Sequence, residues 1–327
     1  MEARSCPPGL EENTMGKQVS RRTFVKLGAA GAAGWIAART SAKTGVGRLA
    51  HAATREYGIS LAGWSLHRTI GTKEGQVPML DMPMLSREEF DIEAIELVNR
   101  MLASTDKAYI DRFIKNAAAH NVKILLIMID VEGNVGAESE TDREEAVERH
   151  KKWIDIAADM GCHTVRMNWA GYSRDIMEHP GALQEYIDRS VSPFRKICDY
   201  GDKKNIDVIV ENHGGPSSYP DALIPLIKKV DHERFGTLPD FGNFPAEVDN
   251  YDAIDRMMPY AKAVSAKCYD FDDETGLETK LDFERIIANV VDKHGYHGYI
   301  GIEYEGNRLS EFDGIRAAKK LLEKLRG

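Results

Sequence analysis

The sequence predicts a single (β/α)8 barrel that occupies most of its 327 residues. From Tyr57 onward, short apolar segments alternate with segments whose apolar residues recur every three to four positions. This alternation is typical of a parallel sheet covered by helices. Hydrophobic residues make up 43% of the chain and charged residues 29%, a composition that supports a large apolar core.

Eight apolar segments predict the strands of the barrel. Each is four to eight residues long, too short for a helix, and rich enough in Ile, Val and Leu for a strand that is buried on both faces. They are Gly58–Ala62, Ile92–Leu97, Val122–Ile129, Thr164–Met167, Ile206–Val210, Phe235–Leu238, Ala263–Ala266 and Tyr299–Ile302.

The segments between these strands have helical periodicity. Lys107–His120 reads KAYIDRFIKNAAAH and places Ile110 and Phe113 on one helical face. The region Leu66–Arg87 lacks such periodicity, and we expect a long loop there that leads into a helix or turn near Ser86–Glu89. The other predicted helices are Asp142–Met160, Leu183–Tyr200, Ser218–Val230, Ala246–Met258, Asp282–His294 and Leu309–Leu325.

A doubly wound open sheet is the alternative fold for this alternation. No G-x-G-x-x-G follows the first predicted strand, so the dinucleotide-binding version of that fold is disfavoured. The sequence also contains no Walker P-loop and no G-x-S-x-G motif.

The first 52 residues are typical of a signal peptide. Ser20–Lys26 reads SRRTFVK, a twin-arginine pattern, and a small-residue run at Leu27–Ala38 follows it. Ala50–Ala52 offers an A-x-A cleavage site. We therefore predict a signal peptide and linker at 1–52, a catalytic domain at 53–327, and export through the twin-arginine pathway to the periplasm. A chance arginine pair before a mobile helix is the alternative.

Charge and cysteine content narrow the class of protein further. Removing the eight basic and three acidic residues of 1–52 leaves 35 basic and 49 acidic residues, a formal charge of −14. Such a chain repels phosphate backbones, so we expect no nucleic-acid partner. No apolar run of 18 residues predicts a membrane span. Three widely spaced cysteines remain, which favours buried thiols over disulfides.

Polar residues gather where the predicted strands end, and barrel enzymes carry their chemistry at the C-terminal strand ends. They are Glu96 of the second strand, Arg166 and Asn168 of the fourth, Glu211 and His213 of the fifth, Asp240 of the sixth, Ser265 and Lys267 of the seventh, and Glu303 and Glu305 of the eighth.

Three of these carboxylates would converge at one side of the barrel mouth: Glu211, Asp240 and Glu303. Without a partner they would repel one another, and at least one would stay protonated. One divalent cation removes this conflict, and oxygen ligands with one imidazole suit Mn, Mg or Co, with Zn also possible. The alternative is pairing with basic side chains, for which the candidates are Arg166, Lys267 and Arg308.

With these motifs in place, the chain resembles the xylose isomerase-like sugar isomerase and epimerase family, which also has an endonuclease branch. The resemblance covers about residues 57–325 and rests on SLAGWSL, IEAIELV, VRMN, VIVENHGG, LPDFGNF and IGIEYEG, in that order. It implies a (β/α)8 barrel with one divalent metal, held by Glu, Asp, His and Glu from strands five to eight. Glu211, Asp240 and Glu303 match three of these ligands.

The sequence departs from the family pattern at two places. The H-x-K of the seventh strand is replaced here by Ser265, Ala266 and Lys267. Either His213 or water would then complete the coordination sphere of the metal, or the site would bind metal weakly or not at all. Asn243 stands where the family has a histidine after the aspartate of the sixth strand.

The resemblance also implies catalytic roles. Glu211 and Glu303 would act as the two general bases, one on each face of the sugar. Lys267 would stabilise an enediolate or hold a hydroxyl, or else only pair with Asp240 or Glu303. His213 would be a ligand or a substrate contact, with a capped loop histidine as the alternative.

Substrate-binding candidates surround these residues. Aromatic faces beside a polar mouth suit sugar rings, although Trp is also a common core residue, and a salt bridge inside the barrel is the alternative for Arg166. The candidates are Trp64, His67, Glu96, Arg166, Asn168 and Asn243.

These observations predict a divalent-metal-dependent isomerase or epimerase that acts on a sugar or keto-sugar by proton abstraction next to a carbonyl. A lyase or dehydratase on the same substrates, for example a keto-glycoside, is the main alternative, and a non-catalytic sugar-binding barrel is another. Acidic charge and predicted export disfavour the endonuclease branch. The sequence leaves the sugar, the stereocentre and the oligomeric state open.

Overall fold

The computed structural model describes residues 55–169 and 175–327, and all of the architecture below lies in the unit His51–Gly327. The predicted signal peptide and linker at 1–52 lie outside the described residues. Within the described ranges, no helix is both long and apolar enough to cross a membrane.

Eight parallel strands form one continuous sheet in the order β6-β5-β4-β3-β2-β1-β8-β7. Backbone hydrogen bonds also join the two end strands, from Lys262 N to Thr237 O and from Ser265 N to Pro239 O, 3.0 Å each, so the sheet closes into a barrel. The strands are β1 Gly58–Ala62, β2 Ala94–Val98, β3 Lys123–Ile129, β4 Thr164–Met167, β5 Asp207–Glu211, β6 Phe235–Leu238, β7 Val264–Cys268 and β8 Tyr299–Tyr304.

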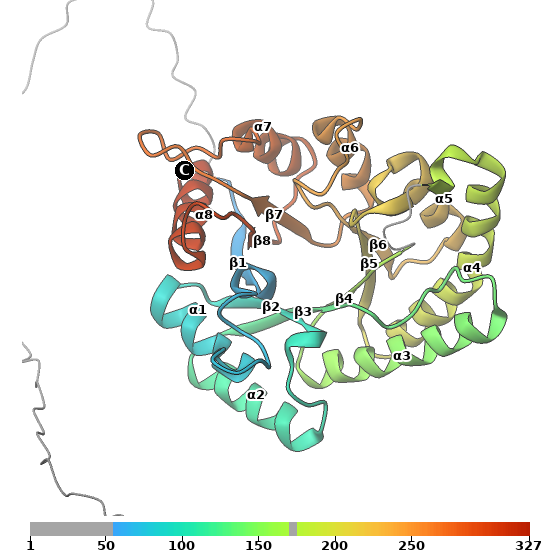
Figure 1. Cartoon of the computed structure of the whole chain (residues 1–327), viewed down its shortest axis with the longest axis horizontal. Coiled ribbons are helices and arrows are strands. Elements are labelled where there is room, and N and C mark those ends of the chain that lie inside the picture. The colour runs from blue at the N-terminus through green and yellow to red at the C-terminus, as the bar shows by residue number, and fades with distance from the viewer. Residues whose placement is uncertain (1–54, 170–174) are drawn as a thin grey trace, which may run out of the picture. The chain divides into compact units, whose positions relative to one another are not determined.

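A helix follows each strand, and these helices surround the strands on the outside (Figure 1). Four of the helices begin at a Ser or Asp whose side chain accepts a hydrogen bond from a backbone N–H of the first turn, which satisfies a donor that the helix leaves free. The helices are α1 Met82–Phe90, α2 Lys107–Ala119, α3 Glu140–Asp159, α4 Pro180–Asp202, α5 Pro220–Val230, α6 Asn250–Met257, α7 Phe283–Ile287 and α8 Glu311–Arg326.

The predicted fold class is confirmed, and all eight predicted strands are present within one or two residues of their expected ends. The first helix was the least certain part of the prediction. It begins at Met82, before the expected Ser86, because Pro83 occupies its first turn, where a missing N–H costs nothing. The predicted helix Asp282–His294 is α7 followed by a π-helical segment, Ala288–Lys293.

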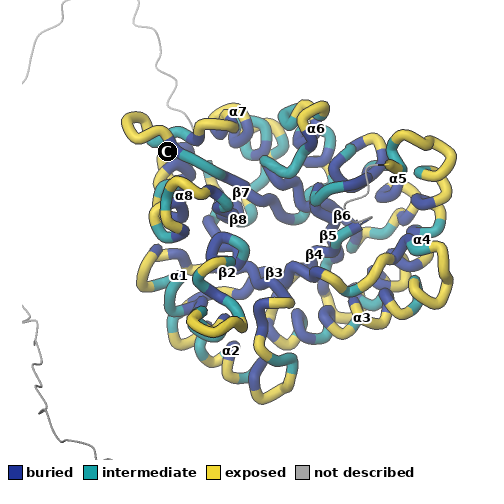
Figure 2. Tube along the Cα trace, in the orientation of Figure 1, coloured by how far each residue is buried: buried dark blue, intermediate teal, exposed yellow. Residues whose placement is uncertain are grey.

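Burial follows the layers of the barrel. The strands and the inner faces of the helices are buried, whereas the outer helix faces and the connecting turns are exposed (Figure 2). The barrel interior also contains buried polar side chains, which is unusual because buried charges are costly unless they are paired. The charged ones on the strands are Glu96, Arg166, Glu211, Lys267 and Glu303.

Candidate active site

The pairing of the last three strands brings the predicted site residues together. Lys267 of β7 lies directly opposite Glu303 of β8 in the parallel register. Asp240, two residues after β6, forms a bridge with Ser265 of β7. Because side chains alternate between the two faces of a strand, Ser265 and Lys267 both point into the barrel, as predicted.

Glu211, Asp240 and Glu303 form a compact carboxylate cluster. Each offers an oxygen to a group in which all ligand atoms lie within 4.8 Å of one another, and all three residues are buried. The convergence predicted from the strand ends is therefore confirmed. His213 does not belong to this group, and its predicted role as a metal ligand stays a prediction.

Ser265 links two of the three carboxylates. Its hydroxyl lies 2.6 Å from Asp240 Oδ2 and 2.9 Å from Glu303 Oε2. A hydroxyl has one proton and can donate to only one of these oxygens. The second short contact is satisfied either by a proton on a carboxyl group or by a cation among the oxygens.

Lys267 provides one of the two permanent positive charges that contact the cluster. Its ammonium lies 2.7 Å from Glu303 Oε1 and 3.1 Å from Glu305 Oε1. Lys267 is buried, so these ion pairs are shielded from solvent and are stronger than surface pairs. The pairing of Lys267 with Glu303 was one of the two predicted alternatives for this lysine.

Arg166 provides the other positive charge. Its Nε lies 2.7 Å from Glu211 Oε2, and its Nη1 lies 2.7 Å from Asp130 Oδ1 and 3.0 Å from Asn168 Oδ1. The contact with Glu211 is an ion pair without hydrogen-bond alignment, since neither Arg166 Nε nor Glu211 Oε2 has a hydrogen-bond partner among the described residues. Glu211 Oε2 thus remains able to accept one.

Backbone and amide donors fix the remaining carboxylate oxygens. Asp240 Oδ1 accepts hydrogen bonds from the N–H groups of Gly242 and Asn243, both at 2.9 Å. The Asn243 side chain donates to Glu211 Oε1 at 2.7 Å. Asn212 pairs with the backbone N–H and C=O of Asp240. Each carboxylate is therefore held in one orientation by the protein.

The three carboxyl groups differ in acidity. Burial raises the pKa of Asp240 well above its ordinary value, and the charges of Glu303 and Glu211 add to the effect. Burial also raises the pKa of Glu211, although Arg166 opposes it. Burial acts in the same direction on Glu303, but Lys267 outweighs it and leaves that pKa below its ordinary value.

These features fit a divalent cation. Among the described residues, the carboxyl groups of Glu211, Asp240, Glu303, Glu305 and Asp130 share two permanent positive charges, those of Lys267 and Arg166. A buried oxygen of Glu211 lacks a hydrogen-bond donor, and Ser265 contacts two acids with one proton. Arg308, the third cation of the pairing alternative, instead binds Asp270 and Asp273.

A cavity of about 790 Å³ opens above the cluster. Strand ends β1 to β5 and β8 contribute to its wall, and the predicted residues Trp64, Asn168, His213 and Glu303 are part of it. The cavity is wide enough for a monosaccharide, because ligand sites of small molecules usually measure ~300–1,000 Å³. Its other lining residues are Arg100, Asp130, Val131, Gly133, Asn134, Arg149 and Glu305.

Four of the six predicted substrate-binding residues are not among the residues that line this cavity. Arg166 and Asn243 contact Glu211 of the carboxylate cluster instead. Glu96 is buried, accepts a hydrogen bond from Ser60 at 2.6 Å, and lies so close to Gly301 that a Cβ there would be 2.5 Å from Glu96 Oε1. His67 contacts the backbone oxygen of Trp64 at 2.7 Å. Whether any of the six candidates binds substrate stays a prediction.

The sequence analysis missed Asp130, which holds Arg166 and Asn168 by hydrogen bonds of 2.7 and 2.9 Å. Its signal was present, because Asp130 directly follows the predicted strand Val122–Ile129 and so lies at a C-terminal strand end. Arg100 was missed because it lies in a short 3-10 turn, Asn99–Met101, two positions beyond the end of β2, where no sequence pattern indicates which way it faces.

The fold and the carboxylate cluster define a (β/α)8 barrel with an acidic site at its C-terminal strand ends. A family model described as "Xylose isomerase-like TIM barrel" matches residues 88–326, and the chain belongs to this family. No curated protein matches the sequence.

Solved structures of similar fold include an L-ribulose 3-epimerase, with a TM-score of 0.68, 14% identity, and coverage of 83% of this chain and 94% of the other. A xylose isomerase-like TIM barrel protein from Mycobacterium smegmatis in complex with magnesium has a TM-score of 0.61 and 18% identity, covering 84% and 97%. The probable 3-DHS dehydratase from Bacillus anthracis has a TM-score of 0.59 and 18% identity, covering 81% and 98%. At these identities the likeness shows the fold alone.

Proposed function

We propose that this protein is a divalent-metal-dependent isomerase or epimerase that moves a proton next to the carbonyl of a sugar or keto-sugar. The observation that carries the proposal is the buried cluster of Glu211, Asp240 and Glu303, which has more negative charge than its two basic partners offset. A monosaccharide-sized cavity lies directly above it. Membership of the xylose isomerase-like family supports the same reaction class.

Glu211, Asp240 and Glu303 would hold the metal, with Ser265 beside them. A divalent metal in this place supplies positive charge that polarises the carbonyl and hydroxyl oxygens of a sugar. The donors around it are oxygens, which favour Mg or Mn, while Co and Zn remain compatible. The magnesium complex of a related barrel supports a hard cation.

Glu303 and Glu211 would move the proton. Lys267 favours the ionised form of Glu303, which lines the cavity and can accept a proton from a substrate carbon. Glu211 offers an oxygen to the same cluster and would act as the second general base, so that one carboxylate removes the proton and the other returns it.

Elimination of water from the same substrates is the second candidate. Ser265 stands where the family pattern has a histidine and so changes the set of side chains around the cluster, and one structure of similar fold is a probable dehydratase. Both reactions begin with the same proton abstraction. They differ in whether the deprotonated carbon is reprotonated or a hydroxyl leaves the neighbouring carbon as a double bond forms.

Export to the periplasm is a further part of the proposal, and its support is the SRRTFVK pattern with the A-x-A site. A periplasmic enzyme would meet free sugars, glycosides or oxidised sugars. Replacing both arginines of the pattern by lysine should retain the protein in the cytoplasm, and cell fractionation measures this.

The test of the proposed reaction is deuterium exchange. The Mn-loaded protein is incubated in D2O with a panel of aldoses, ketoses and keto-glycosides, and the sugars are analysed by NMR and mass spectrometry. We expect deuterium at a carbon next to the carbonyl, together with an isomer. A product that has lost one water would favour the dehydratase.

Two variants test whether the deuterium exchange depends on the carboxylate cluster. Glu303→Gln should abolish exchange, whereas Glu305→Gln, which changes a neighbouring acid outside the carboxylate cluster, should retain most of it. No exchange and no product with any sugar, by a metal-loaded protein that still binds sugar, would favour a non-catalytic sugar-binding barrel and contradict the proposal.

A further inference from the structure

Within the described part of the chain, the cavity wall contains one permanent positive charge without a partner, that of Arg100. Among the described residues, the other lining acids and arginines all form ion pairs: Asp130 with Arg166, Glu303 and Glu305 with Lys267, and Arg149 with Glu145. The Arg100 side chain has no ion pair, hydrogen bond or ring contact within the described parts of the chain.

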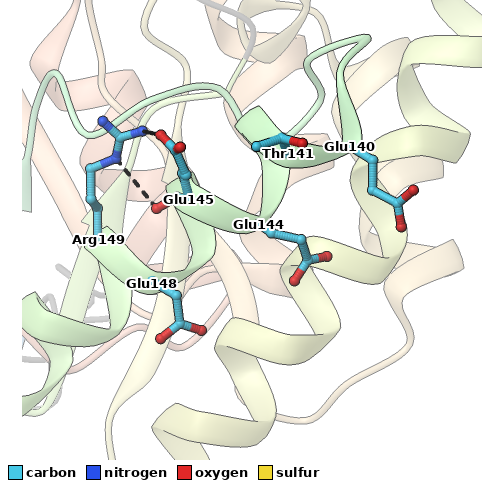
Figure 3. Close-up of a pocket in the computed structure, with 6 residues that line it drawn as sticks. All are labelled: Glu140, Thr141, Glu144, Glu145, Glu148 and Arg149. Carbon is cyan, nitrogen blue, oxygen red and sulfur yellow. Dashed lines mark hydrogen bonds and ion pairs between the residues drawn. The ribbon is translucent and has the colours of Figure 1, made fainter.

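Arg149, unlike Arg100, has an ion-pair partner. It lies on α3 and lines the same cavity, but its Nη2 is 2.8 Å from Glu145 Oε2 one helical turn away (Figure 3). Arg149 therefore has a carboxylate partner, whereas Arg100 has none among the described residues.

The backbone that carries Arg100 is fixed. The buried Asn99 side chain accepts hydrogen bonds from the N–H of Arg100 at 2.7 Å and of Asp130 at 3.0 Å, and it donates to the Asp130 carbonyl at 3.0 Å. One amide thereby joins the ends of β2 and β3. The position from which Arg100 reaches the cavity is set by the fold, although its side chain is exposed.

One residue of the neighbouring wall is an exposed apolar side chain. Val131 is 82% exposed and lines the cavity, and its φ of 64° is a left-handed conformation that a β-branched residue rarely adopts. Strained residues of this kind concentrate at functional sites. Arg100 and Val131 together offer a charge beside a surface against which the C–H groups of a sugar can pack.

We propose that the substrate is a sugar acid whose carboxylate binds Arg100 while its carbonyl end lies at the carboxylate cluster. This inference rests on the proposed function and names its substrate class. The planar guanidinium matches the two oxygens of a carboxylate. The site has a single free arginine and no second unpaired cation among the described lining residues, which favours a carboxylate over the more highly charged phosphate.

The test compares D-glucuronate, D-glucose and D-glucose 6-phosphate as probes. Dissociation constants are measured by calorimetry with the Mn-loaded protein, at low and at moderate salt. We expect glucuronate to bind at least about tenfold more tightly than glucose, the size expected for a charge-assisted hydrogen bond to a carboxylate. This advantage should decrease as salt rises, because the arginine is exposed.

Arg100→Gln should remove the advantage of glucuronate and leave glucose binding within about twofold. Arg149→Gln is the matched control, since it removes a paired arginine from the same wall, and it should change the ratio little. Arg100→Lys should keep part of the advantage of glucuronate. Lysine retains the positive charge but lacks the planar guanidinium that binds both oxygens of a carboxylate.

Equal binding of glucose and glucuronate by the wild type would overturn the proposal, and so would an unchanged ratio in Arg100→Gln. Tighter binding of glucose 6-phosphate than of glucuronate would also overturn it. Deuterium exchange with neutral sugars alone would leave the proposed function intact while refuting the sugar-acid assignment. If no sugar of any kind binds, both fail.

Discussion

The two sides of the barrel mouth are built differently. At the ends of β5 to β8, the carboxylates of Glu211, Asp240 and Glu303 are buried and each is held by protein donors. At the ends of β2 and β3, Arg100 and Val131 are exposed, on a backbone that buried Asn99 fixes. In the proposed function, the rigid side would carry the reaction and the accessible side would recognise the rest of the substrate.

The largest expected effect concerns the free energy of unfolding. Removing an arginine that forms buried ion pairs should lower it more than removing one that forms exposed ion pairs. Arg166→Met leaves Asp130 and Glu211 without their cation inside the barrel, and we expect the free energy of unfolding to fall by about 3–5 kcal/mol. Arg308→Met removes two exposed ion pairs, with Asp270 and Asp273, and should lower the stability far less, because solvent screens both pairs. Urea unfolding of both variants measures this, and equal losses would contradict the distinction.

The buried Glu96 should make the free energy of unfolding depend on pH. Burial, with the charges of Glu303 and Glu211, raises its pKa from 4.5 to about 7, and Ser60 only partly opposes this. The folded protein then holds a proton that the unfolded chain releases, so the free energy of unfolding falls as pH rises from about 4.5 to 7. Glu96→Gln should remove this loss and stabilise the protein at pH 8 by about 3 kcal/mol.

Glu93→Gln is the control for that measurement, because Glu93 precedes the same strand but is exposed. Its pH profile of stability should match that of the wild type. A Glu96→Gln variant with an unchanged profile would show that Glu96 is ionised or solvated in the folded protein.

Val131 gives the smallest expected effect. Its φ of 64° is readily adopted by glycine, so Val131→Gly should raise the free energy of unfolding by about 0.5–1 kcal/mol, after the entropy that glycine adds to the unfolded chain is subtracted. Val131→Ala keeps most of the strain and should change stability by less than about 0.5 kcal/mol. Thermal unfolding distinguishes them, and a clear loss in the glycine variant would show that the valine side chain stabilises the fold.

The sequence contained most of the fold and about half of the site. Apolar runs located the strands because both faces of a parallel barrel strand are buried, and strand ends then located Glu211, Asp240 and Glu303. The bridging contacts of Ser265 could not be predicted, since they depend on how β6 and β7 close the barrel.

The same limit applies to the arginines. Arg166 was predicted as a substrate contact or a salt bridge, but its link between Asp130 and Glu211 requires the distance between β3 and β5, which no local pattern contains. Arg100 follows an apolar run like many surface arginines. Among the described residues of the cavity wall, Arg100 differs from Arg149 in having no ion pair, and only the three-dimensional structure shows this difference.

The central claim is that the carboxylate cluster holds one divalent metal, and metal content tests it most directly. The mature protein is loaded with Mn, dialysed, and analysed for bound metal beside Asp240→Asn and the control Glu305→Gln. The account predicts about one metal per chain in the wild type and in Glu305→Gln, and loss of metal in Asp240→Asn. A folded wild-type protein that retains no Mn, Mg, Co or Zn after such loading would contradict it.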